Sequence, residues 1–397
     1  MSTKALSLTV AVLLFSAYQL QADVINSLWV GGDDGLWDDA SNWSPAIVPD
    51  NSEWRTFAVT ISGEVGVHLG QSRTIDRLNC YGNVEFGRMN RWISLTLQDP
   101  NGLINQGYLW IELQDIDIHH GNLDNFEGST IDLACYSSVS ATTVENAGLI
   151  LIPPTSSLLV DQKLHNKGQI IVYGGICGSS NGILENESTG IINGFGTLVV
   201  PGTIYNNKGK IYATGGGLTV ATYDFLSNTG TIGNSTLTSL NVMQKEVVMD
   251  IGVPSDMHNF GTIEVNAGGG VAFDCNVVNE PNGVVKLLGG ILVATTFTQK
   301  AGATFEGFGG ITGNLVIDPN AIIKLSGPTN IVGDLAIEES AMLDISNGTV
   351  LVTGDLTCDN GIIQTMNSNI IILGEMNGVC RRDFIDVVGL TTDDHNE

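Results

Sequence analysis

The chain has 397 residues, with 16 Lys and Arg against 42 Asp and Glu, which gives a formal net charge of −26. An acidic surface of this kind repels nucleic acid and anionic lipid, so we exclude both as partners. Gly is abundant with 49 residues and Pro is scarce with 10, a composition that favours many tight bends.

Residues 1–22 have the composition of a secretory signal peptide. Lys4 is their only charged residue, an apolar stretch follows it, and Ala22 ends a Leu-Gln-Ala motif that suits cleavage. The apolar stretch is too short to span a bilayer, and the later sequence contains no apolar segment of that length. We therefore expect cleavage near Ala22 and a mature chain that is secreted or held at the cell surface, without a membrane span.

Residues 23–72 do not follow the period of the later sequence, and they are rich in Trp. One use for this segment is a β cap over the open end of a solenoid, because an unpaired parallel edge templates aggregation. The other use is an aromatic platform for sugar rings, formed by Trp29, Trp37 and Trp43. We expect the cap and keep carbohydrate binding by the three Trp residues as the alternative.

A repeat runs through residues 73–373. Its motif is an apolar residue, any residue and Asn, with Gly shortly afterwards and then a short β-type run. Successive Asn residues are separated by 20, 21, 20, 20, 20, 22, 31 and 20 positions, and they are Asn105, Asn125, Asn146, Asn166, Asn186, Asn206, Asn228, Asn259 and Asn279. The frame continues after Asn279 without Asn. A fixed period with strand-like content is typical of a solenoid.

The runs after each bend alternate apolar and polar residues or are fully apolar, and no long helical pattern interrupts them. We therefore predict an all-β, single-stranded parallel β-helix solenoid of about 13 coils of about 20 residues, pectin-lyase-like and right-handed. Strands stacked ~4.8 Å apart would make a rod about 60 Å long. Asn tolerates the left-handed backbone of a bend and can hydrogen-bond to the Asn of the next coil, so we expect an amide ladder.

The interval of 31 residues between Asn228 and Asn259 predicts an insertion at residues 236–256, as a loop or short helix that leaves the stack.

The positions of the cysteines in the repeat predict which of them can pair. Cys135 and Cys177 share a phase but lie two coils apart, and the resulting ~9.6 Å exceeds the ~7 Å limit for a disulfide. We expect both to be free and buried. Cys358 and Cys380 are 22 residues apart, about one coil, and are the best candidate pair.

One strand carries a candidate metal site. Alternation along residues 115–119 places Asp115, Asp117 and His119 on one face, with Ile116 and Ile118 pointing inward. Carboxylate and imidazole groups in such a row can hold a divalent ion. The alternative is that these three side chains form the solvated outer face of the strand.

Several sequence motifs resemble those of exported bacterial β-helical surface proteins of the planctomycete type, which are similar to autotransporter passengers. The motif W-x-G-G-x-x-G-x-W-x-x-x-x-N-W-S spans residues 29–44, G-x-G-x-I-x-G-x-L spans residues 307–315, and Gly-Asp-Leu recurs at residues 333–335 and 354–356. The resemblance covers nearly the whole mature chain. It implies export and a role as a surface or matrix component, and it implies no defined activity.

Residues 374–397 resemble the dockerin-like half-loop that ends many such proteins. By this resemblance the oxygen ligands of an EF-type loop would be Glu375, Asn377, Asp383 and Asp386, and the ion would be Ca²⁺. Val379 occupies a position that needs a side-chain oxygen, and Cys380 replaces the usual Gly. The tail is therefore degenerate as a calcium loop.

Two functions remain. The first is a non-catalytic, monomeric, secreted or cell-surface protein with a structural or adhesive role, in contact with extracellular polysaccharide or with other envelope or matrix proteins. The alternative is a secreted carbohydrate-active enzyme, a polysaccharide lyase or glycoside hydrolase, that acts on one face of the β-helix. An enzyme requires three carboxylates, or carboxylates with Lys163 or Lys167, to meet in one cleft. We favour the non-catalytic function because residues 92–380 contain no Arg to act as a lyase base, and their Lys residues are not clustered beside acidic metal ligands.

Overall fold

The structure is a computed structural model that describes residues 23–88, 93–112, 115–134, 136–179, 182–225, 227–244 and 256–383. The expected signal peptide, Cys135 and Asp386 lie outside these residues. In the described part of the chain, no helix combines the length and the hydropathy that a membrane span requires.

The N-terminal elements are β1 (Asp23–Trp29), β2 (Asp34–Leu36), the short 3-10 helix η1 (Ala40–Asn42), β3 (Trp43–Ser44), β4 (Arg55–Leu69), β5 (Arg73–Ile75) and β6 (Arg77–Arg88). The next strands are β7 (Ser94–Leu97), β8 (Leu103–Asn105), β9 (Tyr108–Ile111), β10 (Asp115–Asn125), β11 (Thr130–Leu133), β12 (Ser138–Asn146), β13 (Leu149–Ile152), β14 (Ser157–Asn166), β15 (Gln169–Ser179), β16 (Ile183–Asn186), β17 (Ile191–Asn207), β18 (Lys210–Phe225), β19 (Ser227–Asn228), β20 (Thr231–Asn234) and β21 (Ser239–Gln244). The C-terminal strands are β22 (Met257–Asn259), β23 (Thr262–Asn266), β24 (Gly270–Phe273), β25 (Val277–Asn279), β26 (Val284–Gln299), β27 (Thr304–Ile317), β28 (Ile322–Val332), β29 (Leu335–Ile337), β30 (Met342–Ser346), β31 (Thr349–Val352), β32 (Leu356–Met366), β33 (Asn369–Ile372) and β34 (Met376–Asp383).

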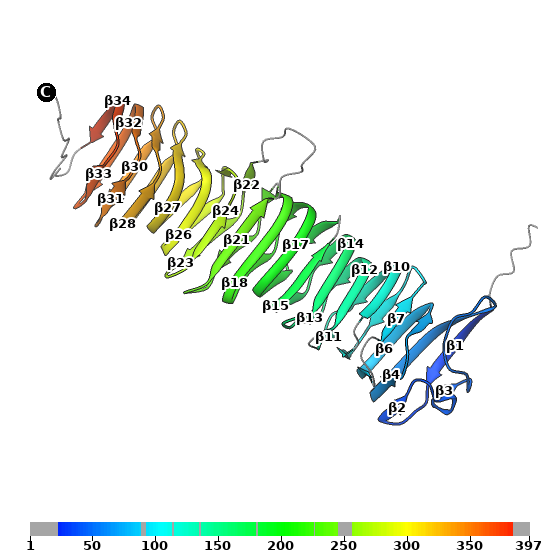
Figure 1. The fold of residues 1–397 in the computed structure, drawn as a ribbon. Coiled ribbons are helices and arrows are strands. Elements are labelled where there is room, and N and C mark those ends of the chain that lie inside the picture. Colours follow the sequence, from blue (N-terminus) through cyan, green and yellow to red (C-terminus); the bar gives the residue numbers. More distant parts are fainter. Residues whose placement is uncertain are drawn as a thin grey trace, which may run out of the picture.

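These strands wind into a rod, with β1 to β3 at one end and β34 at the other (Figure 1). The fold is a parallel β-solenoid of about 15 turns, so the predicted fold class is confirmed. At ~4.8 Å per turn, 15 turns make a rod roughly 70 Å long. The predicted count of about 13 coils is slightly low, because parallel coils also stack before Asn105, where the Asn motif begins. Ile61 and Cys80, for example, hold the position of the ladder Asn in the turns before Asn105.

Strict alternation of buried and exposed residues explains why these segments form strands around one core. In β28 every second residue from Ile323 to Ile331 is buried and the residues between them are exposed. Each coil contributes such residues, and together they form one continuous apolar core along the rod. Because the apolar side chains of one coil pack on those of the next, the period is maintained beyond the last Asn.

The predicted amide ladder is present and fully paired. Each side-chain amide nitrogen donates to the side-chain oxygen one coil further on, at 2.7 to 2.9 Å, along Asn105, Asn125, Asn146, Asn166, Asn186, Asn207, Asn228, Asn259, Asn279 and finally Gln299. Most of these amides also donate to a backbone carbonyl of the next coil, as Asn146 does to Gln169 at 3.2 Å. All ten side chains are buried, so the ladder satisfies polar groups that would otherwise destabilise the core.

The structure corrects two details of the ladder. Asn207, and not Asn206, is the member from its coil, because the register shifts by one residue between Leu184 and Glu185 as β16 pairs with β17. In addition, no ladder Asn has a positive φ, so their left-handed tolerance is not used. The Gly that follows two residues after a ladder Asn allows neighbouring coils to approach closely. A Cβ on Gly168, for example, would lie 2.1 Å from the carbonyl oxygen of Gly148.

Parallel stacking starts before residue 73, where the sequence placed the end of the cap. β4 pairs in parallel with β6 along its whole second part, and β1 and β2 pair in parallel with β4. Among the described pairings, the antiparallel one is β1 with β3. Residues 23–44 therefore form a terminal turn on the solenoid, and their Trp side chains fill its interior.

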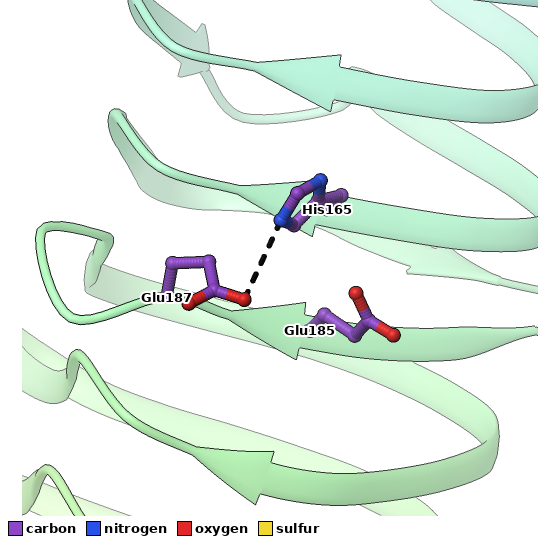
Figure 2. A group of neighbouring side chains, drawn as sticks. All are labelled: His165, Glu185 and Glu187. Atoms are coloured by element: carbon purple, nitrogen blue, oxygen red, sulfur yellow. Dashed lines mark ion pairs between the residues drawn. The ribbon is translucent and has the colours of Figure 1, made fainter.

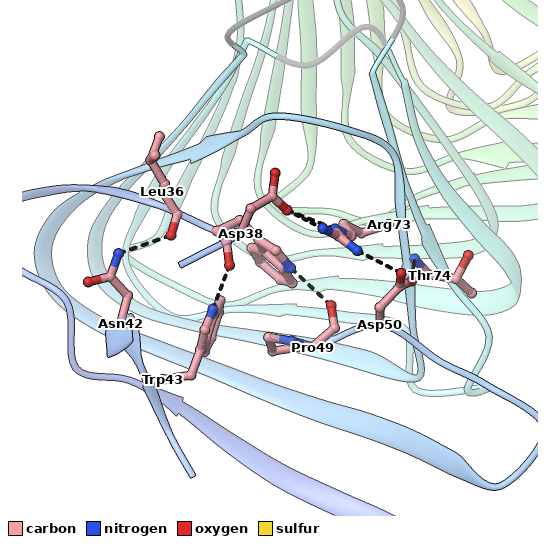
Figure 3. A network of polar contacts seen from close by, with 9 residues as sticks. Leu36, Asp38, Asn42, Trp43, Pro49, Asp50, Arg73 and Thr74 are labelled. Atoms are coloured by element: carbon pink, nitrogen blue, oxygen red, sulfur yellow. Dashed lines mark hydrogen bonds and ion pairs between the residues drawn. The ribbon is translucent and has the colours of Figure 1, made fainter. Parts of the chain in front are cut away.

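Polar contacts hold this terminal turn on the next coil (Figure 3). Arg73, whose side chain is 11% exposed, forms ion pairs with Asp38 and with Asp50, the latter at 2.7 Å. The other carboxylate oxygen of Asp50 accepts the Thr74 backbone N–H at 3.1 Å. Asp38 of the terminal turn and Asp50 of the connection that follows it thus share one guanidinium from β5, which fixes the turn over the end of the core.

The predicted insertion is narrower than residues 236–256. Residues 239–244 form β21, which pairs in parallel with β18 and with β24 and so belongs to the stack. Residues 245–255 lie outside the described residues. The extra length of this coil therefore enters after Gln244.

The structure confirms the predictions for Cys177, Cys358 and Cys380. Cys177 is free and buried, as expected, and burial raises its pKa to about 12. Cys358 and Cys380 form a disulfide between adjacent coils, with their Cα atoms 5.4 Å apart. The pairing proposed from the one-coil spacing is confirmed.

We expect Cys380→Ser to lower the free energy of opening the last coil by about 3 kcal/mol, because the disulfide closes a loop of intermediate length. β34 lies at the end of the stack, and its described pairing is with β32 alone. Hydrogen exchange of residues 376–383 measures the local opening. Unchanged protection in the variant would contradict a stabilising role for the bond, and Cys177→Ser serves as the control for loss of a thiol elsewhere.

Candidate functional site

The three Trp residues considered as a sugar platform are core residues. Trp29, Trp37 and Trp43 are 4%, 0% and 2% exposed, and the rings of Trp37 and Trp43 meet edge to face at a centroid distance of 4.6 Å. The indole N–H of Trp37 donates to the Pro49 carbonyl at 3.0 Å, and that of Trp43 to the Trp37 carbonyl at 2.8 Å. A sugar ring cannot stack on buried faces, so this interpretation is wrong for all three.

The Asp115, Asp117 and His119 row lies on the outer face of β10, as the alternation predicts. Ile116 and Ile118 between them are buried, at 0% and 1% exposure. Burial and the neighbouring Asp117 carboxylate raise the pKa of Asp115. Asp117 accepts a hydrogen bond from the Ser140 hydroxyl at 2.9 Å. Among the described residues these three side chains do not form a converging metal-binding group.

The tail is described as far as Asp383, and this part of it is extended. Residues 376–383 form strand β34, which continues the parallel stack on β32. Glu375 precedes this strand and both it and Asn377 are exposed, while Asp383 ends the strand and Asp386 lies outside the described residues. An extended strand spreads side chains along its length, whereas an EF-type loop curls them around one ion. Residues 376–383 therefore lack the curled geometry of an EF-type loop, and the degenerate dockerin-like tail and its Ca²⁺ stay a prediction for the residues beyond Asp383.

The structure brings a different set of charged residues together. In four successive coils the residue that precedes the ladder Asn is charged or titratable and only partly buried, and the strand register aligns these residues coil above coil as Asp124, Glu145, His165 and Glu185. Coils spaced ~4.8 Å apart allow each side chain to contact the next. We call these four residues the Glu/His row. It follows the outside of the coil beside the buried amide ladder.

His165 is the centre of this row (Figure 2). Its Nδ1 lies 2.5 Å from Glu145 Oε2, and its Nε2 lies 3.6 Å from Oε1 of Glu187, the residue that follows ladder Asn186. The His165 side chain is 13% exposed, so the ring is held by its neighbours. His165, Glu185 and Glu187 each offer one ligand atom, and these atoms lie within 4.8 Å of one another.

Two lysines complete the cluster. Lys163 Nζ lies 2.9 Å from Glu185 Oε2, and Lys208 Nζ lies 3.2 Å from Glu187 Oε1. The hydrogen bond with Glu185 raises the pKa of Lys163, and the hydrogen bond with Lys208 lowers the pKa of Glu187. Burial and the Glu145 charge raise the pKa of Asp124 at the other end of the row.

An enzyme was expected to need three carboxylates, or carboxylates with a Lys, in one cleft. The carboxylates of Glu145, Glu185 and Glu187 do come together with Lys163, but they lie on the outer edge of the coil. A depression of about 440 Å³ lies elsewhere, over β21, β24 and β26, and its lining consists of Gly, Ser239, Asn241 and small apolar residues without a titratable group. None of the residues of the charged cluster lines this depression.

Sequence reasoning named Lys163 and missed the Glu/His row, although the signal was present. Glu145, His165 and Glu185 each occupy the position just before Asn in the repeat, so a constant period predicts that they stack. Glu187 could not be found this way, because it follows the Asn and reaches back across the bend. Comparison with known proteins adds no assignment, since no family model and no curated protein matches the sequence.

Proposed function

We propose that the protein is a non-catalytic rod, secreted or held at the cell surface, with a structural or adhesive role. The observation that carries this proposal is the uninterrupted amide ladder from Asn105 to Gln299 inside a continuous parallel stack. Such a ladder fixes each coil between Asn105 and Gln299 to the next by side-chain bonds in addition to backbone bonds, which favours stiffness along the axis. A stiff rod of roughly 70 Å suits a protein that spaces or connects surface components.

The electrostatics of the charged cluster also favour a non-catalytic role. A Glu acts as an acid–base catalyst near neutral pH when its pKa is raised, and a Lys does so when its pKa is lowered. Here the pKa of Glu187 is lowered and that of Lys163 is raised, because each is paired with an opposite charge. Both groups are held in their charged forms, which suits ion pairing or ligand binding.

The outer faces of such a rod would contact extracellular polysaccharide or other envelope or matrix proteins. Exposed apolar side chains are scattered along them, including Leu159, Tyr173 and Phe308, at 44%, 42% and 41% exposure. The surface as a whole is acidic, with a net charge of −26. This charge favours neutral glycans or basic patches of proteins over anionic polymers.

One observation favours the alternative, a carbohydrate-active enzyme. Asp115 and Asp117 lie on the same outer face, and burial together with the Asp117 charge raises the pKa of Asp115. Glycoside hydrolases use a pair of neighbouring carboxyl groups, one of which has a raised pKa. The two side chains belong to one strand, and the structure shows no third carboxylate converging with them among the described residues.

We expect the purified mature chain to release no product from acidic or neutral polysaccharides, with or without Ca²⁺. Reducing ends measure hydrolysis, and ultraviolet absorbance of unsaturated products measures a lyase reaction. The variant Asp115→Asn is the control. Product formed by the wild type and lost in Asp115→Asn would overturn the non-catalytic proposal, whereas glycan-array binding without turnover would support adhesion.

A further inference from the structure

We propose that His165, Glu185 and Glu187 form a binding site for a divalent transition metal ion of the zinc class. This inference is independent of the proposed rod function, because a rod needs no metal at this place. The three residues lie on β14, on β16 and just after β16, so the site joins two successive coils (Figure 2).

The spacing of the ligand atoms fits such an ion. With metal–ligand bonds of 2.0–2.1 Å, two ligand atoms in a tetrahedral zinc site lie about 3.4 Å apart. His165 Nε2 and Glu187 Oε1 are already 3.6 Å apart. All three ligand atoms lie within 4.8 Å of one another, so Glu185 needs to approach by about 1.4 Å at most. Its side chain is 40% exposed, which leaves room for that rotation.

Glu145 prepares His165 for metal binding. Ligating histidines commonly donate their second ring N–H to a carboxylate, which orients the ring and makes the other nitrogen a better ligand. Glu145 Oε2 occupies that position, 2.5 Å from Nδ1. With the proton on Nδ1, the Nε2 lone pair faces Glu185 and Glu187. The orienting carboxylate, the ring and the two ligand carboxylates come from three successive coils.

The chemistry of the ligands selects the ion. Imidazole nitrogen together with carboxylate oxygen suits zinc and its neighbours, whereas calcium and magnesium prefer oxygen alone. Three protein ligands leave one tetrahedral position for water. Lys163 and Lys208 compete for Glu185 and Glu187, so an ion must displace both ammonium groups. Removal of either lysine charge should therefore strengthen metal binding.

His258 provides a matched control within the same repeat. It precedes ladder Asn259, as His165 precedes Asn166, and its Nδ1 lies 2.7 Å from Glu280 Oε1. The register, however, places Val278 where the His165 site has Glu185. His258 thus has a carboxylate partner and lacks the third ligand.

The test is calorimetric titration of the untagged mature chain with Zn²⁺ in a buffer that does not chelate metals. We expect one equivalent bound by the wild type and by His258→Ala. His165→Ala and Glu187→Gln should weaken binding by at least about tenfold, and Glu145→Gln by about tenfold, because loss of an orienting partner typically has that effect. Lys163→Met and Lys208→Met should bind more tightly. Co²⁺ bound in place of Zn²⁺ should give the visible spectrum of a tetrahedral site.

Several results would overturn the site. They are a wild type that binds no Zn²⁺, full binding by His165→Ala, and loss of binding in His119→Ala, which would move the site to β10. Circular dichroism and a urea midpoint establish that each variant is folded. If His165→Ala does not fold, the lysine variants decide the question, because unchanged affinity in both would show that Glu185 and Glu187 do not bind the ion.

Discussion

Asn207→Ala is expected to lower the free energy of unfolding by about 3–6 kcal/mol, because it leaves several buried polar groups without partners at about 1–3 kcal/mol each. Asn207 is 0% exposed. Its Nδ2 donates to Asn228 Oδ1 at 2.8 Å and to the Thr231 carbonyl at 3.2 Å, and its Oδ1 accepts from Asn186 at 2.7 Å. Ala removes these three bonds and a fourth, from Nδ2 to the Gly209 carbonyl at 3.3 Å, and interrupts the ladder in its middle.

Asn206→Ala is the matched control, one residue away. Asn206 lies outside the ladder, and its Oδ1 accepts only exposed hydrogen bonds from Thr229, at 3.2 Å from the backbone nitrogen and 3.0 Å from the hydroxyl. We expect a loss below about 1 kcal/mol. Urea unfolding followed by circular dichroism compares the two variants. Equal effects, or a larger effect at Asn206, would contradict the register that places Asn207 in the ladder.

Trp37→Ala is expected to cost about 3–5 kcal/mol and to make the protein aggregate from its N-terminal end, because a large buried aromatic is removed from a cap over a parallel edge. Trp37 is fully buried, packs against Trp43, and contacts Phe86 of β6 at a centroid distance of 6.3 Å. Its carbonyl also accepts the Trp43 indole N–H. Loss of this side chain loosens the terminal turn from the coil beneath it.

Trp54→Ala is the control, because Trp54 belongs to the same segment and is 60% exposed. Thermal unfolding and light scattering over time measure the two effects. We expect scattering to grow for Trp37→Ala and to stay at the wild-type level for Trp54→Ala. A Trp37→Ala protein that unfolds at a lower temperature without aggregating would show that this side chain stabilises the turn without protecting the edge.

The candidate site shows where sequence reasoning stops. Alternation along residues 115–119 correctly placed Asp115 and Asp117 outside and Ile116 inside, because alternation is a local property of one strand. It also drew attention to three residues that do not converge. The converging residues come from different coils, and contacts between residues about 20 positions apart depend on the register of each strand pair.

The sequence by itself determined the period, the parallel β-solenoid and the amide ladder, because each follows from residue types repeated at a near-constant interval. It also named Cys358 and Cys380 as the best candidate disulfide pair, and the structure shows the bond. Only the tertiary structure decided which Asn of the Asn206–Asn207 pair enters the ladder, since a bulge in β17 shifts the register there. It also decided that the Trp residues are core and that Glu187 joins the stacked Glu145, His165 and Glu185. These outcomes depend on how one coil lies on the next, and the order of residues within a single coil does not specify that geometry.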